Sequence, residues 1–180
     1  MTEIISEPLP GVYILQNFFN NDERGFFSKI FNEDSFNNIG LDFKPKEHFF
    51  TTSKQDVIRG MHFQVGSSAQ DKLIFCTQGS FVDVIVDVRK GSPSFNKPFS
   101  IELFAEDSKS IFIKKGYAHG FLSNTKLSSI HYLTSTIHNP LNDKGVLWKS
   151  IDFEWPIKNP IVSKRDLNHP SINEIKCEFS

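Results

Sequence analysis

Residues 82–88 read VDVIVDV, and this stretch decides the fold class of the chain. Valine alternates with aspartate or isoleucine throughout, a period of two that is typical of a β-strand. Further strands are expected in short runs of apolar and β-branched residues bounded by turn residues. These runs are residues 11–18 (GVYILQNF), 73–77 (LIFCT), 99–104 (FSIELF), 110–115 (SIFIKK) and 129–136 (SIHYLTST). The sequence therefore predicts an all-β protein.

Helical periodicity is scarce and is confined to residues 33–38 and the end of the chain. Gln78-Gly79-Ser80 separates two expected strands and predicts a hairpin turn that pairs them. Short strands separated by Gly and Pro predict a β-sandwich or a closed jelly roll with a few short helices. From Asn139 onward the chain is richer in Pro and Asn. We expect this segment to wrap the sheet, so that residues 1–180 form a single domain.

Composition limits the partners of the chain. Its 180 residues include 38% hydrophobic residues, enough for one sizeable core, and its formal net charge is -1. Without a Lys/Arg stripe, bulk electrostatics give no attraction to nucleic acid or anionic lipid. Residues 1–11 lack the pattern of a secretion signal, and no apolar run approaches the length of a membrane span. Cys76 and Cys177 have no disulfide or metal-ligand pattern, so we expect a soluble cytoplasmic protein.

Two histidines follow a glycine closely in the sequence. His62 belongs to RGMHFQ and His119 to GYAHGF. Glycine in these places predicts tight turns at strand ends, where the backbone can approach a ligand. A buried histidine taken alone is more often a hydrogen-bonded structural residue than a functional one. The function of both residues therefore depends on their neighbours.

Several segments, taken together in order and spacing, closely resemble the dTDP-4-dehydrorhamnose 3,5-epimerase family. They are DERGFF (22–27), VIRGMHFQ (57–64), AQDKL (69–73), GSFVDVIVDVRKGSPSF (79–95) and GYAHGF (116–121). The resemblance extends from about residue 8 to residue 170. It implies a cupin-type jelly roll, a homodimer and no cofactor. The implied reaction inverts C3, C5 or both in a nucleoside-diphosphate 4-keto-6-deoxy sugar, in deoxysugar biosynthesis for cell-surface polysaccharide.

The resemblance also implies catalytic roles. A ketone at C4 acidifies the hydrogens on C3 and C5, so inversion requires a base on one face of the sugar and an acid on the other. His62 is the implied base, with Asp166 orienting its ring and supporting the imidazolium. Tyr132 is the implied acid on the opposite face. Lys72 is expected to stabilise the negative charge that develops on O4.

Substrate-binding roles are implied for a further group of residues. His119 and Gln64 are expected to line the sugar pocket. Arg59 and Arg24 are expected to meet the diphosphate, because a guanidinium group suits phosphate oxygens. The aromatic side chains of Phe18, Phe19, Phe26 and Phe27 either stack on the nucleotide base or pack in the core or at a dimer contact.

A catalytic metal is not expected. Metal-binding cupins usually supply a His-x-His pair, a carboxylate and a further histidine. This chain has His62-Phe63-Gln64 in the first place and only His119 in the second. Two imidazoles are too few to fix a transition-metal ion, so the set predicts metal-independent chemistry.

Departures from the family pattern leave the substrate open. Lys29 stands where the family commonly has Glu, Phe49 where it has Asn, and Ile137-His138 where it has paired tyrosines. The nucleotide (dTDP, CDP or GDP), the sugar (hexose or heptose) and the epimerised carbon therefore stay undecided. Two alternatives remain: a sugar-nucleotide-binding cupin without turnover, and a sugar-nucleotide ketoisomerase.

Overall fold

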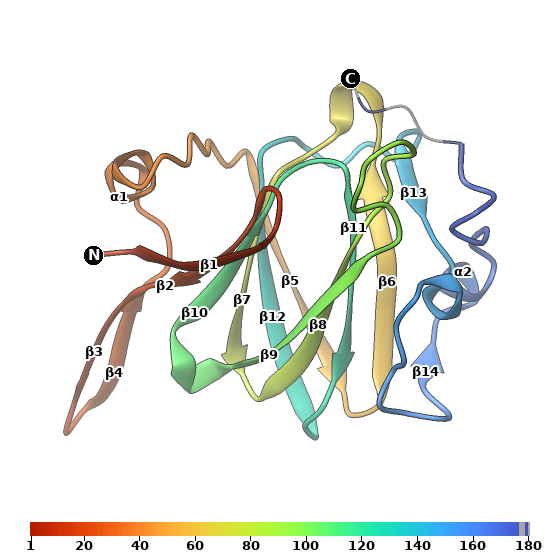
Figure 1. Cartoon of the computed structure of the whole chain (residues 1–180). Helices are drawn as coiled ribbons and strands as arrows, with labels where there is room; N and C mark the ends of the chain where they lie inside the picture. The colour runs from red at the N-terminus through yellow and green to blue at the C-terminus, as the bar shows by residue number, and fades with distance from the viewer. Residues whose placement is uncertain (177–178, 180) are drawn as a thin grey trace.

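A computed structural model of the chain describes residues 1–176 and 179 and shows two β-sheets packed face to face (Figure 1). One sheet has the order β1-β2-β10-β7-β12-β5. Its strands are β1 (Glu3–Leu9), β2 (Val12–Gln16), β10 (Lys109–Ile113), β7 (Lys72–Gln78), β12 (Leu127–Thr134) and β5 (Glu47–Lys54). The predicted all-β jelly roll is thereby confirmed.

The other sheet has the order β13-β6-β11-β8-β9, with β14 pairing in parallel with β6. Its strands are β13 (Asp143–Gly145), β6 (Val57–Gln64), β11 (Tyr117–Ser123), β8 (Ser80–Asp87), β9 (Pro98–Phe104) and β14 (Ile161–Val162). The helices are α1 (Glu33–Asn38) and α2 (Lys164–Leu167), with short 3₁₀ turns at Gly66–Ser68, Ala105–Asp107 and Trp148–Ser150. The helix predicted at residues 33–38 is confirmed, whereas the other helix lies before the end of the chain.

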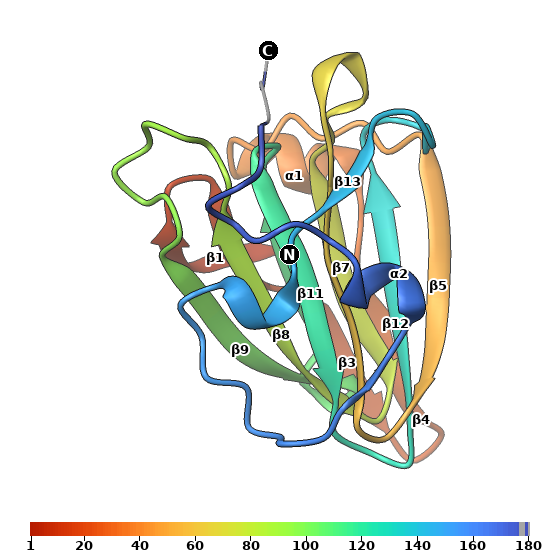
Figure 2. The same cartoon turned by 90° about the vertical axis from the view of Figure 1, so that its right-hand side faces the viewer.

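Strand β8 is buried on both faces. Phe81 and Ile85 point into the core between the sheets. Val84 and Val86 point the other way and pack with Trp155 of the C-terminal segment. The predicted wrapping is therefore confirmed: residues after 145 cross the outer face of the second sheet (Figure 2).

The predicted hairpin between residues 73–77 and 82–88 is wrong. β7 and β8 lie in different sheets, so the turn carries the chain from one layer to the other. Gly79 adopts φ 71°, and a Cβ there would lie 2.5 Å from the carbonyl oxygen of Leu127. The glycine is required for a tight passage between sheets, which has the same sequence pattern as a hairpin turn.

The strand-end position expected for His62 and His119 is also wrong. Both residues lie within strands, β6 and β11, and they are directly opposite each other in the ladder. A Cβ on Gly60 would lie 2.5 Å from the Cα of Gly120. Gly60 therefore lets two strands approach each other, where the sequence analysis expected the backbone to approach a ligand.

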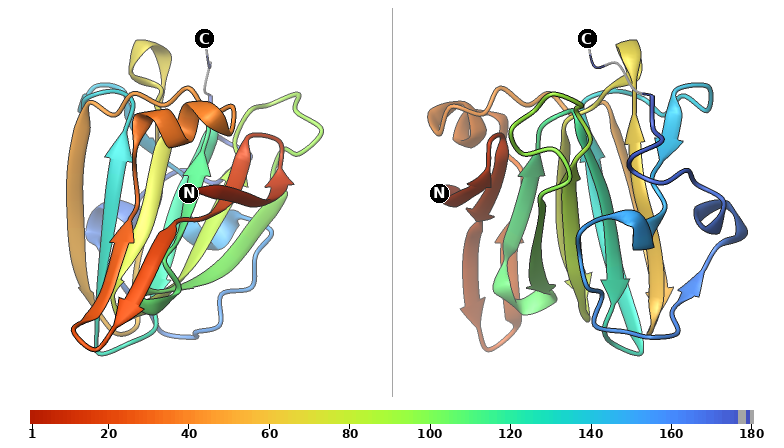
Figure 3. Two further views of the ribbon diagram at one scale, coloured as in Figure 1. Left: turned by 90° about the vertical axis from the view of Figure 1, so that its left-hand side faces the viewer. Right: turned by 45° about the vertical axis from the view of Figure 1, so that its right-hand side comes forward.

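A small hairpin extends away from the barrel (Figures 1 and 3). It consists of β3 (Phe18–Asp22) and β4 (Gly25–Lys29), which pair antiparallel. Its aromatic side chains are 39–57% exposed and contact one another in cross-strand pairs. They are Phe18, Phe19, Phe26 and Phe27. The hairpin therefore presents an apolar surface that residues 1–176 and 179 leave uncovered.

Two predictions on location and cysteines can be compared with the structure. Within residues 1–176 and 179, no helix has the length and apolar character needed to cross a membrane. Cys76 is a buried free thiol, and burial raises its pKa to about 11. Cys177 lies outside the described residues.

Substitution of Trp155 tests how strongly the wrapping segment is held on the second sheet. It is 7% exposed, and its indole N–H donates to the carbonyl of Trp148 at 3.0 Å. Trp155→Ala should lower the free energy of unfolding by about 3–5 kcal/mol because it opens a cavity against β8. Urea denaturation measures the loss. Leu141→Ala, at a residue 83% exposed, is the control and should change stability by less than about 0.5 kcal/mol. Equal losses would contradict the packing role of Trp155.

Candidate active site

A pocket of about 250 Å³ lies between the two sheets. It is lined by side chains from β5, β6, β7, β11 and β12, together with residues of β13 and α2. The lining includes most of the residues predicted for the site: Arg59, His62, Gln64, Lys72, His119 and Tyr132. Asp166 joins them through a contact with His62. Strands distant in sequence therefore bring the predicted catalytic set together.

Half-buried His62 and buried Asp166 form a dyad. Nε2 of His62 lies 2.7 Å from Oδ1 of Asp166, and Oδ2 accepts the N–H of Gly60 at 3.2 Å. Burial of the Asp166 carboxyl acts to raise its pKa, but the hydrogen bonds from His62 and Gly60 outweigh burial and hold that pKa below its ordinary value. The carboxylate therefore accepts the Nε2 proton of His62 and leaves Nδ1 as the basic nitrogen.

Asp166 is positioned by the short helix α2. Ser163 caps this helix, and its hydroxyl accepts the N–H of Asp166 at 3.1 Å. The segment that carries α2 wraps the outer face of the second sheet, which contains His62 (Figure 2). The dyad therefore depends on how the C-terminal segment packs.

Lys72 enters the pocket from β7. Its side chain is 7% exposed, and its Nζ donates to the carbonyl of His62 at 3.0 Å. Burial lowers the pKa of Lys72 to about 8, although Asp143 and Asp83 act in the opposite direction. The pocket therefore holds a poorly hydrated cation that an anionic substrate group would stabilise.

His119 has a carboxylate partner of its own. Nε2 of His119 is hydrogen-bonded to Oδ1 of Asp83, and both side chains are buried. Burial lowers the pKa of His119 against the opposing effect of Asp83. The site therefore contains a second His–Asp pair beside the first, because His119 and His62 are opposite in the ladder.

Tyr132 lies on the other sheet. Its ring stacks on Phe49 at 4.7 Å and meets the ring of His119 edge to face at 5.8 Å. Burial raises the pKa of Tyr132, while the nearby charge of Arg59 opposes that rise. The phenol therefore stays protonated at neutral pH and is available as a proton donor.

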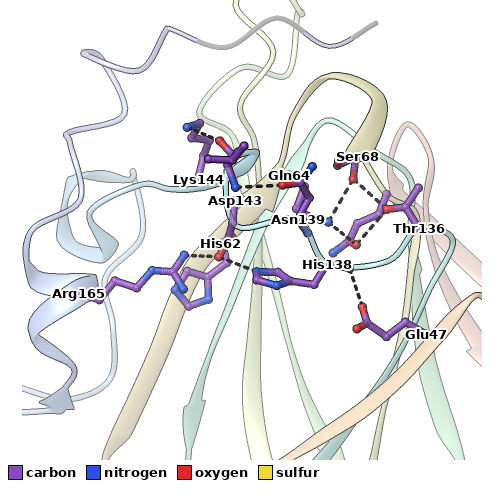
Figure 4. A network of polar contacts seen from close by, with 12 residues as sticks. Glu47, His62, Gln64, Ser68, Thr136, His138, Asn139, Asp143, Lys144 and Arg165 are labelled. Carbon is purple, nitrogen blue, oxygen red and sulfur yellow. Dashed lines mark hydrogen bonds and ion pairs between the residues drawn. The ribbon is translucent and has the colours of Figure 1, made fainter.

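A polar network holds the rim of the pocket (Figure 4). The Asp143 carboxylate accepts from Arg165 at 2.6 Å and contacts Nε2 of His138 at 3.2 Å.

Gln64 accepts the N–H of Asn139 at 2.7 Å, and its amide nitrogen donates to the carbonyl of Ser68 and to the side chain of Gln70. Gln64 thus lines the pocket while its amide group fixes the surrounding loops.

Three predicted binding residues lie outside this pocket. Arg24, Phe19 and Phe27 belong to the β3–β4 hairpin. Arg24 is 84% exposed and forms a two-pronged ion pair with Asp22, with nitrogen–oxygen distances of 3.1 and 2.6 Å. Within one chain, the structure does not bring these residues to His62.

The sequence analysis missed Asp83 and His169. Asp83 alternates in phase with Phe81 and Ile85, so the period-two pattern places its carboxylate on the inward face of the strand. A buried carboxylate there requires a hydrogen-bonding or charged partner. His169 lies near Asp166, with Nε2 3.5 Å from the same Oδ1 that binds His62. The donor atoms of His62, Asp166 and His169 lie within 4.8 Å of one another, which is compatible with metal ligation. The sequence analysis considered only His62 and His119 as imidazole ligands.

Known proteins resemble this chain over nearly its whole length. A family profile described as dTDP-4-dehydrorhamnose 3,5-epimerase matches residues 6–174. An enzyme of that name from Shigella flexneri is 36% identical over 168 residues, covering 92% of this chain and 93% of that protein. The enzyme from Bacillus anthracis, solved with TDP and PPi bound, superposes with a TM-score of 0.91 at 32% identity, covering 95% of this chain and 99% of that one. A Legionella pneumophila dTDP-6-deoxy-D-glucose-3,5-epimerase in complex with dTDP-4-keto-L-rhamnose gives 0.92 at 27% identity, covering 98% and 95%.

The lowered pKa of Lys72 predicts a stability effect. Between its folded value of about 8 and its ordinary value of 10.5, the unfolded chain keeps a proton that the folded chain releases. The cost of burying the cation is therefore complete below that window and disappears above it. Lys72→Met should raise the free energy of unfolding at about pH 7 by about 1–3 kcal/mol, and the gain should shrink towards about pH 9.5.

Urea unfolding at both pH values measures this gain, with Lys54→Met, at an exposed lysine, as the control. A Lys72→Met variant no more stable than the parent chain would contradict the prediction. It would mean that the hydrogen bond to the His62 carbonyl outweighs the cost of burial.

Proposed function

Because the chain belongs to the dTDP-4-dehydrorhamnose 3,5-epimerase family, it is an isomerase acting on a nucleoside-diphosphate 4-keto-6-deoxy sugar, and we propose that His62 is its catalytic base. The observation that carries this proposal is the pairing of His62 with ionised Asp166 inside a pocket that also contains Tyr132. The comparisons give no support to a binding-only cupin or to a ketoisomerase.

The proposed reaction begins with removal of a proton from the carbon next to the C4 ketone. Nδ1 of His62 takes the proton, and the electron pair of the broken C–H bond moves to O4 to give an enolate. Asp166 stabilises the resulting imidazolium through the 2.7 Å contact with Nε2. The dyad supports this role because burial excludes water from the carboxylate side of the ring.

The enolate requires positive charge and a new proton. Lys72 is proposed to stabilise O4, since its buried ammonium group lines the same pocket. Tyr132 is proposed to donate a proton to the opposite face of the carbon, which inverts the stereocentre. His119, held by Asp83, is proposed to fix the orientation of the sugar. Gln64 is proposed to shape the sugar end of the pocket.

The nucleotide is proposed to be dTDP and to reach the pocket with its diphosphate near Arg59. The Bacillus relative holds TDP, and the Legionella relative holds a dTDP-linked 4-keto sugar. Arg59 lines the pocket, and its Nε donates to the hydroxyl of Ser53 at 3.0 Å. Its terminal nitrogens have no hydrogen-bond partner among the described residues and are proposed to bind phosphate oxygens. His138, on the pocket rim, is proposed to influence which of C3 and C5 is epimerised.

A homodimer is proposed to complete the site. Arg24, Phe19 and Phe27 project from a hairpin with exposed aromatic rings, and they are remote from the pocket of their own chain. In the proposed dimer, this hairpin covers the pocket of the partner and contacts the nucleotide. A single catalytic domain in the cytoplasm is also proposed, supported by the free thiol of Cys76.

Deuterium exchange separates the two proton-transfer roles. In deuterated water, His62→Asn should abolish both exchange and inversion, lowering the rates by about 10²–10⁴-fold. Tyr132→Phe should lose inversion by a similar factor but keep exchange at the C–H bond that faces His62, because the base is intact. NMR of 4-keto sugars on several nucleotides measures both and identifies the carbon. His48→Asn, at an exposed histidine, is the control. Near-parent exchange in His62→Asn would exclude His62 as the base.

Subunit complementation tests the proposed dimer. His62→Asn and Arg24→Ala each damage a different half of a composite site, so each homodimer should be weakly active. After unfolding and refolding together, random heterodimers should restore about a quarter of parent activity, since one of their two sites is intact. If mixing restores nothing while Arg24→Ala alone is impaired, Arg24 acts within its own chain and the shared site is wrong.

A further inference from the structure

A second imidazole shares the carboxylate of the catalytic dyad. Nε2 of His62 lies 2.7 Å from Oδ1 of Asp166, and Nε2 of His169 lies 3.5 Å from that same oxygen. The two imidazole rings meet edge to face at 5.6 Å. The reaction proposed above uses His62 and Asp166 and gives His169 no role.

The surrounding structure encloses His169 in this position. Its side chain is 12% exposed, and its Nε2 has no hydrogen-bond partner among the described residues. A buried polar atom without a partner costs stability and calls for an explanation. The ring occupies the space over Gly145, where a Cβ would lie 2.3 Å from Nε2. Gly145 in turn pairs with His62 in the β13–β6 ladder. The backbone therefore leaves room for an imidazole beside the dyad.

The donor atoms suit a transition-metal ion. Two imidazole nitrogens and one carboxylate oxygen lie within 4.8 Å of one another. Tetrahedral Zn²⁺, with metal–ligand bonds of about 2.0–2.2 Å, requires its donor atoms to be about 3.3 Å apart. The contacts of 2.7 and 3.5 Å to Asp166 need shifts of about 0.6 and about 0.2 Å to reach that spacing, and the two imidazole nitrogens need the same separation from each other. Nitrogen donors disfavour Mg²⁺ and Ca²⁺, which prefer oxygen ligands.

We propose that His62, Asp166 and His169 reversibly bind one divalent transition-metal ion of the Zn²⁺ class, and that the bound ion switches the enzyme off. The inhibition rests on the proposed role of His62 as base, whereas the metal site does not. Coordination through Nε2 of His62 moves the ring proton to Nδ1, so the imidazole stays neutral and loses the free electron pair that would remove the substrate proton. The ion also replaces the hydrogen bond between His62 and Asp166.

The ion has a route to this site beside the sugar pocket. A separate cavity of about 370 Å³ lies next to His169 and is also lined by Gly145, Asp143 and Glu174. Its cationic lining residues are Lys144, Arg165 and Lys176. Arg165 is paired with Asp143 at 2.6 Å, which reduces its repulsion of an incoming cation, and Glu174 adds a second carboxylate. Metal binding is therefore compatible with an empty or an occupied sugar pocket.

Metal titration without substrate tests the site itself. Isothermal titration of the chelator-treated full chain with Zn²⁺ should give about one ion per chain, and Co²⁺ should give the visible absorption of a tetrahedral N/O site. His169→Ala should weaken Zn²⁺ binding by at least about tenfold because one of the ligands is lost. Mg²⁺ should not bind. Unchanged Zn²⁺ affinity in His169→Ala, or no binding to the parent chain, would overturn the proposal.

A surface histidine pair supplies the matched control. Nε2 of His48 lies 3.1 Å from Nδ1 of His131 on the exposed side of β5 and β12, so this pair is the alternative location that the experiment has to exclude. His48→Ala should leave both affinity and stoichiometry unchanged. Loss of binding in this variant would place the metal at the surface and refute the assignment to Asp166.

Inhibition is measured separately. Zn²⁺ should abolish deuterium exchange in the parent enzyme, and a chelator should restore it. His169→Ala should retain basal exchange and require at least about tenfold more Zn²⁺ for the same inhibition. Tight Zn²⁺ binding with full activity would refute the switch, whereas a chain inactive without metal would count against the proposed epimerase mechanism and leave the titration result intact.

Discussion

The close approach of β6 and β11 at Gly60 and Gly120 is the constraint on which the site depends. No side chain fits between these strands, since a Cβ on Gly60 would meet the backbone of Gly120 at 2.5 Å. The register that follows puts His62 directly opposite His119. Adjacent strands in register place two imidazoles in one pocket without any flexible loop, which favours a preorganised site.

The carboxylates that serve these histidines come from different layers of the molecule. Asp83 belongs to β8, inside the second sheet, whereas Asp166 belongs to the segment that covers the outer face of that sheet. Packing of Trp155 and its neighbours therefore supports the His62–Asp166 pair as well as stability, because it holds the wrapping segment in place. One His–Asp pair is therefore contained within the sheet, whereas the other requires the C-terminal segment to be packed on that sheet.

The sequence predicted the layers better than their connections. VDVIVDV predicted a strand because its period is local, and the residues after Asn139 predicted a covering segment by composition. Gly79 was assigned to a hairpin because a turn between layers has the same local pattern, and only pairing with distant β11 distinguishes them. The catalytic set came from resemblance, since nothing local links His62 to Asp166. His169 was missed because its position depends on the space that Gly145, lacking a side chain, leaves for the imidazole ring.

The buried ammonium group of Lys72 lowers the stability of the free protein but suits a pocket that binds negative charge. Lys72 is buried without a carboxylate in hydrogen-bond contact among the described residues, and its pKa falls to about 8 in consequence. In the free protein this burial lowers stability. The increase in the free energy of unfolding expected for Lys72→Met reflects that cost. In the proposed mechanism, an enolate on the substrate supplies the missing negative charge at the moment when the reaction needs a cation. In that mechanism, the same burial that destabilises the empty pocket makes it complementary to the charged intermediate, which favours a cation on a rigid central strand over one on a solvated loop.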